Sequence, residues 1–410
     1  MEWRDTYADR MNLIGDTAVI ELLKLAERPD VLSFAGGLPD DATFPMEAMK
    51  EVAVQVFETH GSMSLQYGPT AGYTALREWI AGRMGPVEGV TATVDDIIVT
   101  TGGIEAMDLI AKMLLNPGDV IVVEAPTYLT AFSVFRCYDV DFVAVDIDDE
   151  GMRVDLLEAQ LAELERRGKR AKLIYTMPTF QNPGGVTMPL ERRRRLVELA
   201  DRYNIPILED HAYAELYFEH APPPSLKALN PDGVLFVSTF SKIFGPGIRL
   251  GWIAAPPPVI AQLCQAKLGS DQCSSTLGQR IVYEYGRQGL MDSQIVLSRA
   301  LYQAKRDVTL DALKEHAPPG LTWTRPDGGF YVWLTAPEGI DSTAMLAWAV
   351  EHEKVAYVAG PSFYTDGRGA NQFRLCYSFL DQSLIGEGIS RVCRSVAHHV
   401  ERRHRDRIGV

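Results

Sequence analysis

Cysteine is scarce in this sequence, and the few cysteines present are scattered along the chain. There are five: Cys137, Cys264, Cys273, Cys376 and Cys393. Their number is odd and no close pair has the spacing of metal ligands, which argues against a disulfide framework and against a zinc site. We therefore expect reduced thiols, a cytoplasmic protein and no bound metal.

A long apolar run and an excess of positive charge are also absent. No apolar stretch is long enough to span a bilayer, and the first residues lack the basic segment and apolar core of a signal peptide. The net charge of −14 disfavours nucleic acid and anionic membranes as partners. Of the two basic runs, we expect residues 192–195 to form a solvated helix face and residues 401–407 to be a frayed terminus.

The chain does have the length and composition of an ordinary folded protein. Its 410 residues, 46% hydrophobic and 23% charged, are enough for two domains. Short apolar runs alternate with longer helical patterns, which predicts an α/β domain around a mostly parallel sheet. The apolar runs are residues 97–99, 120–123, 173–175, 205–208 and 234–237, and the helical patterns include residues 104–115, 190–203 and 256–286.

The pattern changes beyond residue 290. A long charged helix and several strand-like segments there predict a smaller α+β domain. Near the N-terminus, residues 16–27 have the pattern of a short amphipathic helix. The late elements are a helix over 292–315, strands at 328–334, 355–358 and 373–377, and a helix near 383–398. We divide the chain into an N-terminal segment that packs on the small domain (1–45), a large domain (46–290) and a small C-terminal domain (291–410).

Lys242 lies in the most informative segment of the chain. The apolar run 234–237 leads into it as a buried strand, and a lysine buried at a strand end is costly unless it is paired or loses its charge. A Schiff base with a carbonyl cofactor achieves the second in part. The hydroxyls of Thr239 and Ser241 and the cation of Arg249 suit a nearby phosphate. The alternative interpretation is a surface lysine in a polar loop.

Polar residues follow other predicted strands at their carboxyl ends, where ligands bind in open α/β sheets. After residues 97–99 comes a turn containing Gly102, Gly103 and Ile104. Its backbone N–H groups could bind a phosphate, although a plain tight turn is equally consistent with the sequence. Tyr128 follows the next strand and can either stack on a flat ring or pack as an ordinary aromatic.

Further candidates lie at two other strand ends and near the C-terminus. The amide of Asn182 can donate to a phenolate oxygen, or Asn182 is a turn residue before proline. Asp210, with Tyr213 close behind it, can face a protonated pyridine nitrogen or cap a helix. Arg374 suits bidentate recognition of a carboxylate, or it is an edge-strand arginine held by an internal acid.

The order of these motifs decides between the alternatives. A glycine turn, an aromatic, an asparagine, an aspartate with a tyrosine, a lysine with an arginine and a late arginine follow one another. In this order the chain, from Leu32 to Arg374, resembles the class I and II aminotransferases that use pyridoxal phosphate. It is most similar to the group of 2-aminoadipate and kynurenine aminotransferases. The resemblance implies the fold of aspartate aminotransferase, fold type I of pyridoxal-phosphate enzymes, and a homodimer with shared active sites.

The resemblance also assigns a role to each candidate. Lys242 would hold the cofactor as an internal aldimine and shuttle the proton between the substrate Cα and the cofactor. Asp210 would pair with the pyridine nitrogen, and Tyr128 would stack on the ring. The phenolate oxygen would be bound by Asn182 and Tyr213. The phosphate would lie among Gly102, Gly103, Ile104, Thr239, Ser241, Arg249 and the other subunit's Tyr67, and the substrate α-carboxylate would bind Arg374, with Gly37 and Asn182 nearby.

Two departures from the family pattern bear on specificity. Relatives often carry a hydroxyl and an amide where this chain has Gly103 and Ile104, so phosphate binding would rest more on backbone N–H groups. Relatives that handle dicarboxylates place an arginine where this chain has Ile20. We therefore expect apolar or aromatic amino donors.

Three functions compete at this point. The first is an aminotransferase, in which an L-amino acid gives its nitrogen to the cofactor and a 2-oxo acid collects it in a ping-pong mechanism. The second keeps the cofactor but eliminates, cyclises or oxidises an amino acid. The third is a regulatory protein, because some transcription regulators contain an aminotransferase-like domain; the acidic charge disfavours it.

Overall fold

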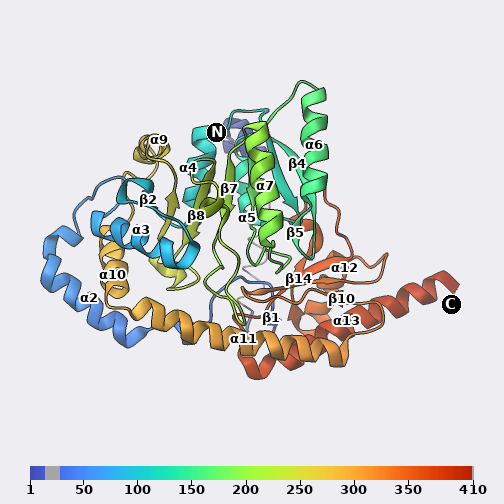
Figure 1. Cartoon of the computed structure of the whole chain (residues 1–410). Helices are drawn as coiled ribbons and strands as arrows, with labels where there is room; N and C mark the ends of the chain where they lie inside the picture. Colours follow the sequence, from blue (N-terminus) through green and yellow to red (C-terminus); the bar gives the residue numbers. More distant parts are fainter. Residues whose placement is uncertain (14–27, 409–410) are drawn as a thin grey trace.

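The computed structural model of the chain describes residues 1–13 and 28–408. The helix expected over residues 16–27, including Ile20, lies outside these described residues. A large sheet covered by helices and a smaller sheet beside it make up the fold (Figure 1). The α-helices are α2 (Met46–His60), α3 (Thr74–Glu88), α4 (Gly103–Leu114), α5 (Leu129–Arg136), α6 (Val154–Arg166), α7 (Leu190–Tyr203), α8 (Leu226–Leu229), α9 (Pro257–Leu268), α10 (Thr276–Arg287), α11 (Leu290–His316), α12 (Ser342–Trp348) and α13 (Gln382–Ile408).

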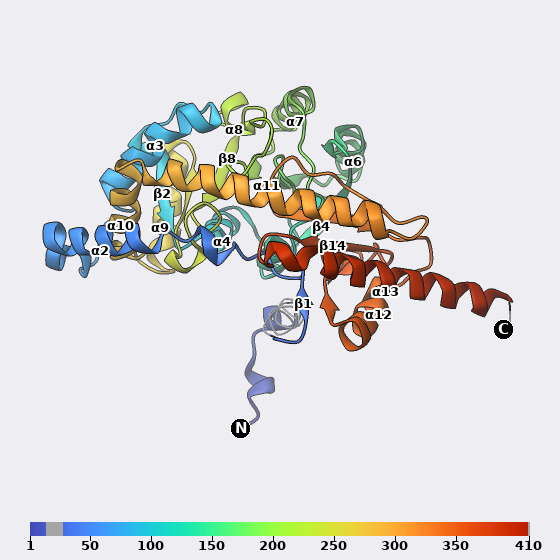
Figure 2. The same ribbon diagram turned by 90° about the horizontal axis from the view of Figure 1, so that it is seen from below.

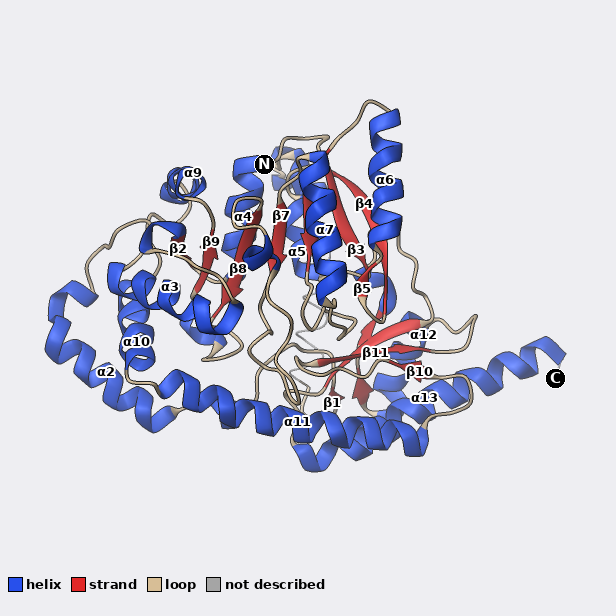
Figure 3. Cartoon of the chain, in the orientation of Figure 1, coloured by secondary structure: helices blue, strands red, loops and turns tan. Residues whose placement is uncertain are grey.

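The large sheet has eight strands in the order β2-β9-β8-β7-β6-β3-β4-β5. Neighbours from β8 to β4 in this order are parallel, while β9 and β5 are antiparallel to their neighbours. Helices cover both faces (Figure 3), and the central strands are accordingly buried along almost their whole length. The strands are β2 (Ile97–Thr100), β3 (Val120–Ala125), β4 (Asp141–Asp148), β5 (Gly151–Met152), β6 (Ala171–Thr176), β7 (Ile207–Asp210), β8 (Val234–Thr239) and β9 (Gly251–Ala254).

The predicted α/β architecture with a mostly parallel sheet is confirmed, with one strand displaced. The run 205–208 begins too early, because Pro206 has no N–H to donate to a neighbouring strand and β7 starts after it. Asp210 therefore ends the strand and does not follow it. The sequence pattern did not indicate β4, whose residues are mostly half-buried, or the short β9, which runs into three consecutive prolines.

The helical patterns 104–115, 190–203 and 292–315 correspond to α4, α7 and α11. The prediction of one helical stretch over 256–286 is wrong, because α9 and α10 are separate helices. Gly269 ends α9, Gln272 has a positive φ of 64°, and the Ser275 hydroxyl accepts the backbone N–H of Gly278 at the start of α10. These local stop and start signals override the apolar periodicity.

The prediction of a solvated basic face on α7 is wrong for Arg193, which is 0% exposed. Its guanidinium donates to the carbonyl oxygens of Pro178, Met188 and Pro224 and to the hydroxyl of Thr179. Burial of an arginine is tolerated here because four oxygens accept its hydrogen bonds. The contact ties α7 to the segment that carries Asn182.

The smaller sheet has the strand order β10-β11-β14-β13. Helices α11 and α13 lie side by side along it (Figure 2). The N-terminal strand β1 (Leu32–Ser33) pairs in parallel with β12 (Val355–Ala356), so the segment after residue 28 joins this part of the molecule. The expected frayed end at residues 401–407 is instead the last part of α13. The remaining strands are β10 (Thr322–Trp323), β11 (Tyr331–Thr335), β13 (Val358–Ala359) and β14 (Gln372–Cys376).

Candidate active site

A cavity of about 170 Å³ lies at the carboxyl ends of β6, β7 and β8. Segments far apart in the sequence meet there, because parallel strands present their ends at one edge of the sheet. Among the residues that line it are these candidates from the sequence: Gly103, Ile104, Tyr128, Asn182, Asp210, Tyr213, Thr239, Ser241, Lys242 and Arg249.

Two more candidates contact this lining from neighbouring segments. The carbonyl oxygen of Gly37 accepts a hydrogen bond from Lys242 Nζ at 2.7 Å. Arg374, in β14, donates from Nη1 to Asn182 Oδ1 at 2.9 Å. The N-terminal segment and the smaller sheet therefore both reach the cavity of the large sheet.

Tyr67 does not line this cavity. Its side chain is 74% exposed, in the segment between η4 (Gly61–Ser64) and α3, near exposed Met63 and Leu65. Ile20 lies outside the described residues. The roles expected of Tyr67 and Ile20 stay predictions.

Lys242 lies in the loop that follows β8 and is partly buried. Its amine donates to the Gly37 carbonyl, and among the described residues it forms no ion pair with a carboxylate. The rings of Tyr213 and Phe330 lie 5.8 Å from Nζ. Burial lowers the pKa of this amine to about 8, so a neutral, nucleophilic fraction exists near neutral pH.

Asp210 is the last residue of β7 and is 3% exposed. One of its carboxylate oxygens accepts a hydrogen bond from Tyr175 Oη at 2.9 Å. Burial raises the pKa of the carboxyl to about 6. A buried carboxylate of this kind is stabilised by a positive partner in the cavity.

Two donors at the cavity edge are buried without a hydrogen-bond partner: Asn182 Nδ2 and Arg374 Nε. The Arg374 guanidinium also donates to the Ala35 carbonyl oxygen and lies 4.3 Å from the centre of the Tyr331 ring. Unpaired buried donors are uncommon in folded proteins. Here they mark positions where acceptor oxygens of a ligand would bind.

The glycine turn before α4 and the loop after β8 line the cavity together. Gly102 has a φ of +87°, a conformation that residues with a side chain rarely adopt, and a Cβ there would lie 2.5 Å from Arg249 Nη2 and displace that guanidinium, so glycine is strongly favoured. The hydroxyls of Thr239 and Ser241 lie 2.9 Å apart. The first N–H groups of α4 have no partner within the helix. Backbone donors, hydroxyls and a guanidinium thus meet at one place, as an anion requires.

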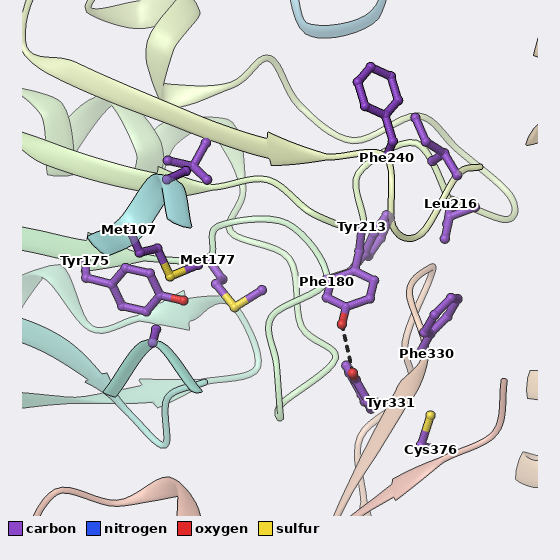
Figure 4. Close-up of a cluster of buried hydrophobic side chains, with 14 of the residues drawn as sticks. Met107, Tyr175, Met177, Phe180, Tyr213, Leu216, Phe240, Phe330, Tyr331 and Cys376 are labelled. Atoms are coloured by element: carbon purple, nitrogen blue, oxygen red, sulfur yellow. Dashed lines mark hydrogen bonds between the residues drawn. The ribbon is translucent and has the colours of Figure 1, made fainter. Parts of the chain in front are cut away.

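Two tyrosines of the site, Tyr331 and Tyr175, were not indicated by the sequence motifs. The hydroxyls of Tyr213 and Tyr331 lie 2.8 Å apart, and Figure 4 shows the two side chains pointing toward one another. Tyr175, in β6, holds Asp210. Gly328 and Gly329 before Tyr331 are a sequence signal for a close backbone approach, whereas nothing local marks Tyr175.

A larger groove, of about 660 Å³, lies between β4 and the smaller sheet. Several of its polar groups are paired with one another: Arg368 binds Asp146 and Tyr364 donates to Gln372. None of its lining residues has a buried polar atom without a partner in the part of the chain that the structure describes. The smaller cavity is therefore the better candidate for chemistry.

Residues 1–13 and 28–408 contain neither a cluster of metal ligands nor a membrane-spanning helix. These residues contain no group of three or more metal-ligating side chains placed to hold an ion. No helix among them is long and apolar enough to cross a membrane.

The sequence profile of the family aminotransferase class I and II matches residues 29–392. The chain is 45% identical over 403 residues to aromatic-amino-acid aminotransferase 1 of Thermococcus litoralis, covering 98% of this chain and 96% of the relative. It is 36% identical over 400 residues to the 2-aminoadipate transaminase of Thermus thermophilus, covering 97% and 98%. The chain belongs to the aminotransferase class I and II family and is a pyridoxal-phosphate-dependent aminotransferase.

Solved structures agree with this assignment. The multiple substrate aminotransferase of Thermococcus profundus superposes with a TM-score of 0.94 at 42% identity, covering 98% of this chain and 100% of the other. The kynurenine aminotransferase of Pyrococcus horikoshii, solved with PMP, gives 0.93 at 40% identity, covering 97% and 98%. Aspartate aminotransferase of Thermus thermophilus superposes with a TM-score of 0.84, covering 95% of this chain and 99% of the other. At 24% identity, this likeness shows the fold alone.

The residues of the cavity fit pyridoxal phosphate. The unpartnered Asn182 Nδ2 is a donor for the phenolate oxygen, and the buried Asp210 is an acceptor for a protonated ring nitrogen. The Lys242 amine, whose hydrogen-bond acceptor among the described residues is the Gly37 carbonyl, is available to the aldehyde. The donors around Gly102 suit the phosphate. Each polar feature of the cofactor therefore has a complementary group.

Proposed function

We propose that Lys242 carries pyridoxal phosphate in this cavity and that the protein moves an amino group from an L-amino acid to a 2-oxo acid by a ping-pong mechanism. The proposal rests mainly on the position of the Lys242 amine. This amine shares one cavity with the Asp210 carboxylate and the Asn182 amide, and it forms no ion pair with a carboxylate among the described residues. When bound, the cofactor withdraws electrons from the substrate Cα and stores the amino group between the two halves of the reaction.

In this proposal, each side chain of the cavity has a separate role toward the cofactor ring or the substrate. Asp210 keeps the proton on the ring nitrogen, because a buried carboxylate favours a cationic neighbour. Asn182 and Tyr213 hold the phenolate oxygen, and Tyr128 packs on the ring. A Lys242 amine with a pKa near 8 can accept a proton from the substrate Cα and return it.

Anion recognition falls to the rim of the cavity. Arg374 presents its guanidinium to the substrate α-carboxylate beside Gly37, and its unpartnered Nε is the donor that this carboxylate would satisfy. The phosphate lies among Gly102, Gly103, Ile104, Thr239, Ser241 and Arg249. Because Gly103 and Ile104 contribute no polar side chain, their backbone N–H groups carry this contact.

An apolar or aromatic amino donor is the proposed preference. The cavity is lined in part by Met107, Met177 and Tyr128, which support it. Arg28, a cation that could replace the arginine missing at Ile20, is hydrogen-bonded to Asp30. The relatives named for aromatic amino acids and kynurenine agree with this preference, and the one named for 2-aminoadipate does not.

We further propose a homodimer with shared active sites. Tyr67, Leu65 and Met63 are 74%, 73% and 57% exposed in one segment, an apolar surface that a second copy would cover. Sedimentation tests it: we expect a dimer, and a fully active monomer would refute shared sites.

Half-reactions of the purified protein test the function. The protein loaded with pyridoxal phosphate is mixed with single amino acids, and cofactor absorbance reports amino transfer. We expect conversion by aromatic and apolar donors and reversal by 2-oxo acids. Turnover that needs no 2-oxo acid would favour elimination, cyclisation or oxidation instead.

Ile20→Arg tests the specificity proposal on the same donor panel. A second substrate carboxylate without a cationic partner costs several kcal/mol to desolvate, so the wild type should favour aromatic donors over glutamate and 2-aminoadipate in kcat/KM. The arginine variant should gain on the two dicarboxylates. A wild type that already prefers dicarboxylates, or a variant that gains nothing, would remove Ile20 as the determinant.

A further inference from the structure

A buried ion-pair cluster adjoins the glycine turn of the candidate phosphate site. Lys267, in α9, is 0% exposed. Its Nζ lies 2.5 Å from Asp271 Oδ1, 3.0 Å from Ser274 Oγ and 3.2 Å from Glu105 Oε2. We call Lys267 and the residues joined to it the Lys267 cluster: Thr101, Glu105, Lys267, Asp271 and Ser274.

The cluster holds Thr101, the residue before Gly102, by both its side chain and its main chain. The Thr101 hydroxyl lies 2.7 Å from Asp271 Oδ2 and 3.1 Å from Ser274 Oγ. Its backbone N–H donates to the Glu105 carboxylate. The start of the turn therefore cannot rotate without breaking hydrogen bonds to two partly buried carboxylates, both ion-paired with the buried Lys267.

The other end of the cluster is anchored as firmly. The Lys267 carbonyl oxygen accepts the backbone N–H groups of Ser270, Asp271 and Gln272, which closes the chain after α9. The cluster thus joins the beginning of α4 to the end of α9, two helices that pack on each other. Neither connection uses a residue that lines the cavity.

The turn itself needs such support. Two consecutive glycines lose more conformational entropy on ordering than any other pair, and Ile104 offers no polar side chain and is 43% exposed. Backbone N–H groups bind an anion well only when their directions are fixed in advance.

We propose that the Lys267 cluster is the positioning device of the phosphate-binding turn, holding Thr101 so that the N–H groups of Gly103 and Ile104 face the phosphate. This inference rests on the proposed function, because it assumes that the cofactor phosphate binds at this turn. Lys267 and Thr101 act through the turn and touch neither cofactor nor substrate.

The test compares the binding of pyridoxal phosphate with that of pyridoxal, which lacks the phosphate, to apo-protein by absorbance titration. In Lys267→Met we expect the affinity for pyridoxal phosphate to fall by about tenfold or more while that for pyridoxal stays unchanged, as for loss of a charged hydrogen-bond network. Thr101→Val, which exchanges a hydroxyl for a methyl without changing charge, should show a smaller loss of the same kind.

Lys227→Met is the matched control. Lys227 is also buried, at 4% exposure, but it donates to the carbonyl oxygens of Pro231 and Val234 at the opposite end of β8 from Thr239. Both affinities should stay at the wild-type value. This control separates the effect of losing any buried lysine, measured in Lys227→Met, from the effect of loosening the turn, measured in Lys267→Met.

An equal loss for both compounds in Lys267→Met, or an unchanged ratio of the two affinities in both cluster variants, overturns the inference. If Lys267→Met does not fold, Thr101→Val decides alone by the same ratio. Wild-type protein that binds neither compound would instead contradict the proposed function. If the wild type binds both compounds, the variants test the role of the cluster alone.

Discussion

Two regions beside the same glycine turn treat a buried lysine in opposite ways. The ammonium group of Lys267 is enclosed by Glu105, Asp271 and Ser274. The amine of Lys242, at the cavity, donates to the Gly37 carbonyl and forms no ion pair with a carboxylate among the described residues. Burial lowers the pKa of this amine to about 8. The lysine that joins two helices is ion-paired with two carboxylates. A lysine proposed to exchange its proton is left without an acid, so that its charge is easily lost.

The same contrast extends to carboxylates. Asp271 and Glu105 share Lys267 as an ion-pair partner, whereas Asp210 accepts a hydrogen bond from a tyrosine hydroxyl. Burial raises the pKa of both Glu105 and Asp210, that of Asp210 to about 6. At the cavity, by contrast with the cluster, two buried donors have no hydrogen-bond partner among the described residues: Asn182 Nδ2 and Arg374 Nε. We take this as the physical signature that separates the site from the structural network next to it.

The largest expected effect comes from removing the under-paired lysine. Lys242→Ala should abolish amino transfer and the attachment of pyridoxal phosphate that borohydride makes permanent, because no other amine lines the described cavity. Mass spectrometry after borohydride treatment and an assay of turnover measure both. Thr101→Val, with Lys242 intact, should retain the attachment at saturating cofactor. Normal activity of Lys242→Ala would contradict the catalytic role proposed for Lys242 and its contrast with Lys267.

Asp210→Asn should have the next largest effect on activity. Without the carboxylate the ring nitrogen loses its proton, and we expect kcat to fall by several orders of magnitude while the protein stays folded. Stopped-flow half-reactions and thermal unfolding measure the two quantities. A loss of less than about tenfold, only ~1.4 kcal/mol of barrier, would contradict the assignment of Asp210.

The low pKa of Lys242 predicts a pH effect on stability. The amine titrates near pH 8 in the folded protein and near about 10.4 when unfolded, so the unfolded state binds more protons in between. The free energy of unfolding of apo-protein should therefore rise with pH over this window, relative to Lys242→Met. Urea unfolding of both proteins at several pH values measures the difference.

Tyr331→Phe should have the smallest effect. It removes the hydroxyl that pairs with Tyr213 but leaves the ring over Arg374, so kcat/KM should fall by a factor that corresponds to about 0.5–1.5 kcal/mol. Tyr364→Phe, whose hydroxyl bonds Gln372 in the other groove, is the control and should change nothing. Equal losses in the two variants would show that the Tyr213 contact has no special role.

Local sequence patterns were sufficient for much of the framework and for most of the cavity. Apolar runs mark β3, β6 and β8 because strands buried on both faces need continuous apolar residues. Polar residues placed just after such runs meet in space, because parallel strands end at one edge of the sheet. This is why Tyr128, Asn182, Asp210 and Lys242 could be assembled without coordinates.

Packing between distant segments decided the rest. Packing buries Arg193, joins Tyr213 to Tyr331 and Tyr175 to Asp210, and forms the Lys267 cluster. These contacts join residues separated by up to 173 positions, as Thr101 and Ser274 are. Periodicity reports which face of an element is apolar, but it does not report which polar group of another element will reach a buried charge. By itself, then, the sequence determined five strands of the large sheet, the order of the site residues and the family. Only the tertiary structure decided which charges are paired and which remain free to react, because pairing depends on long-range contacts.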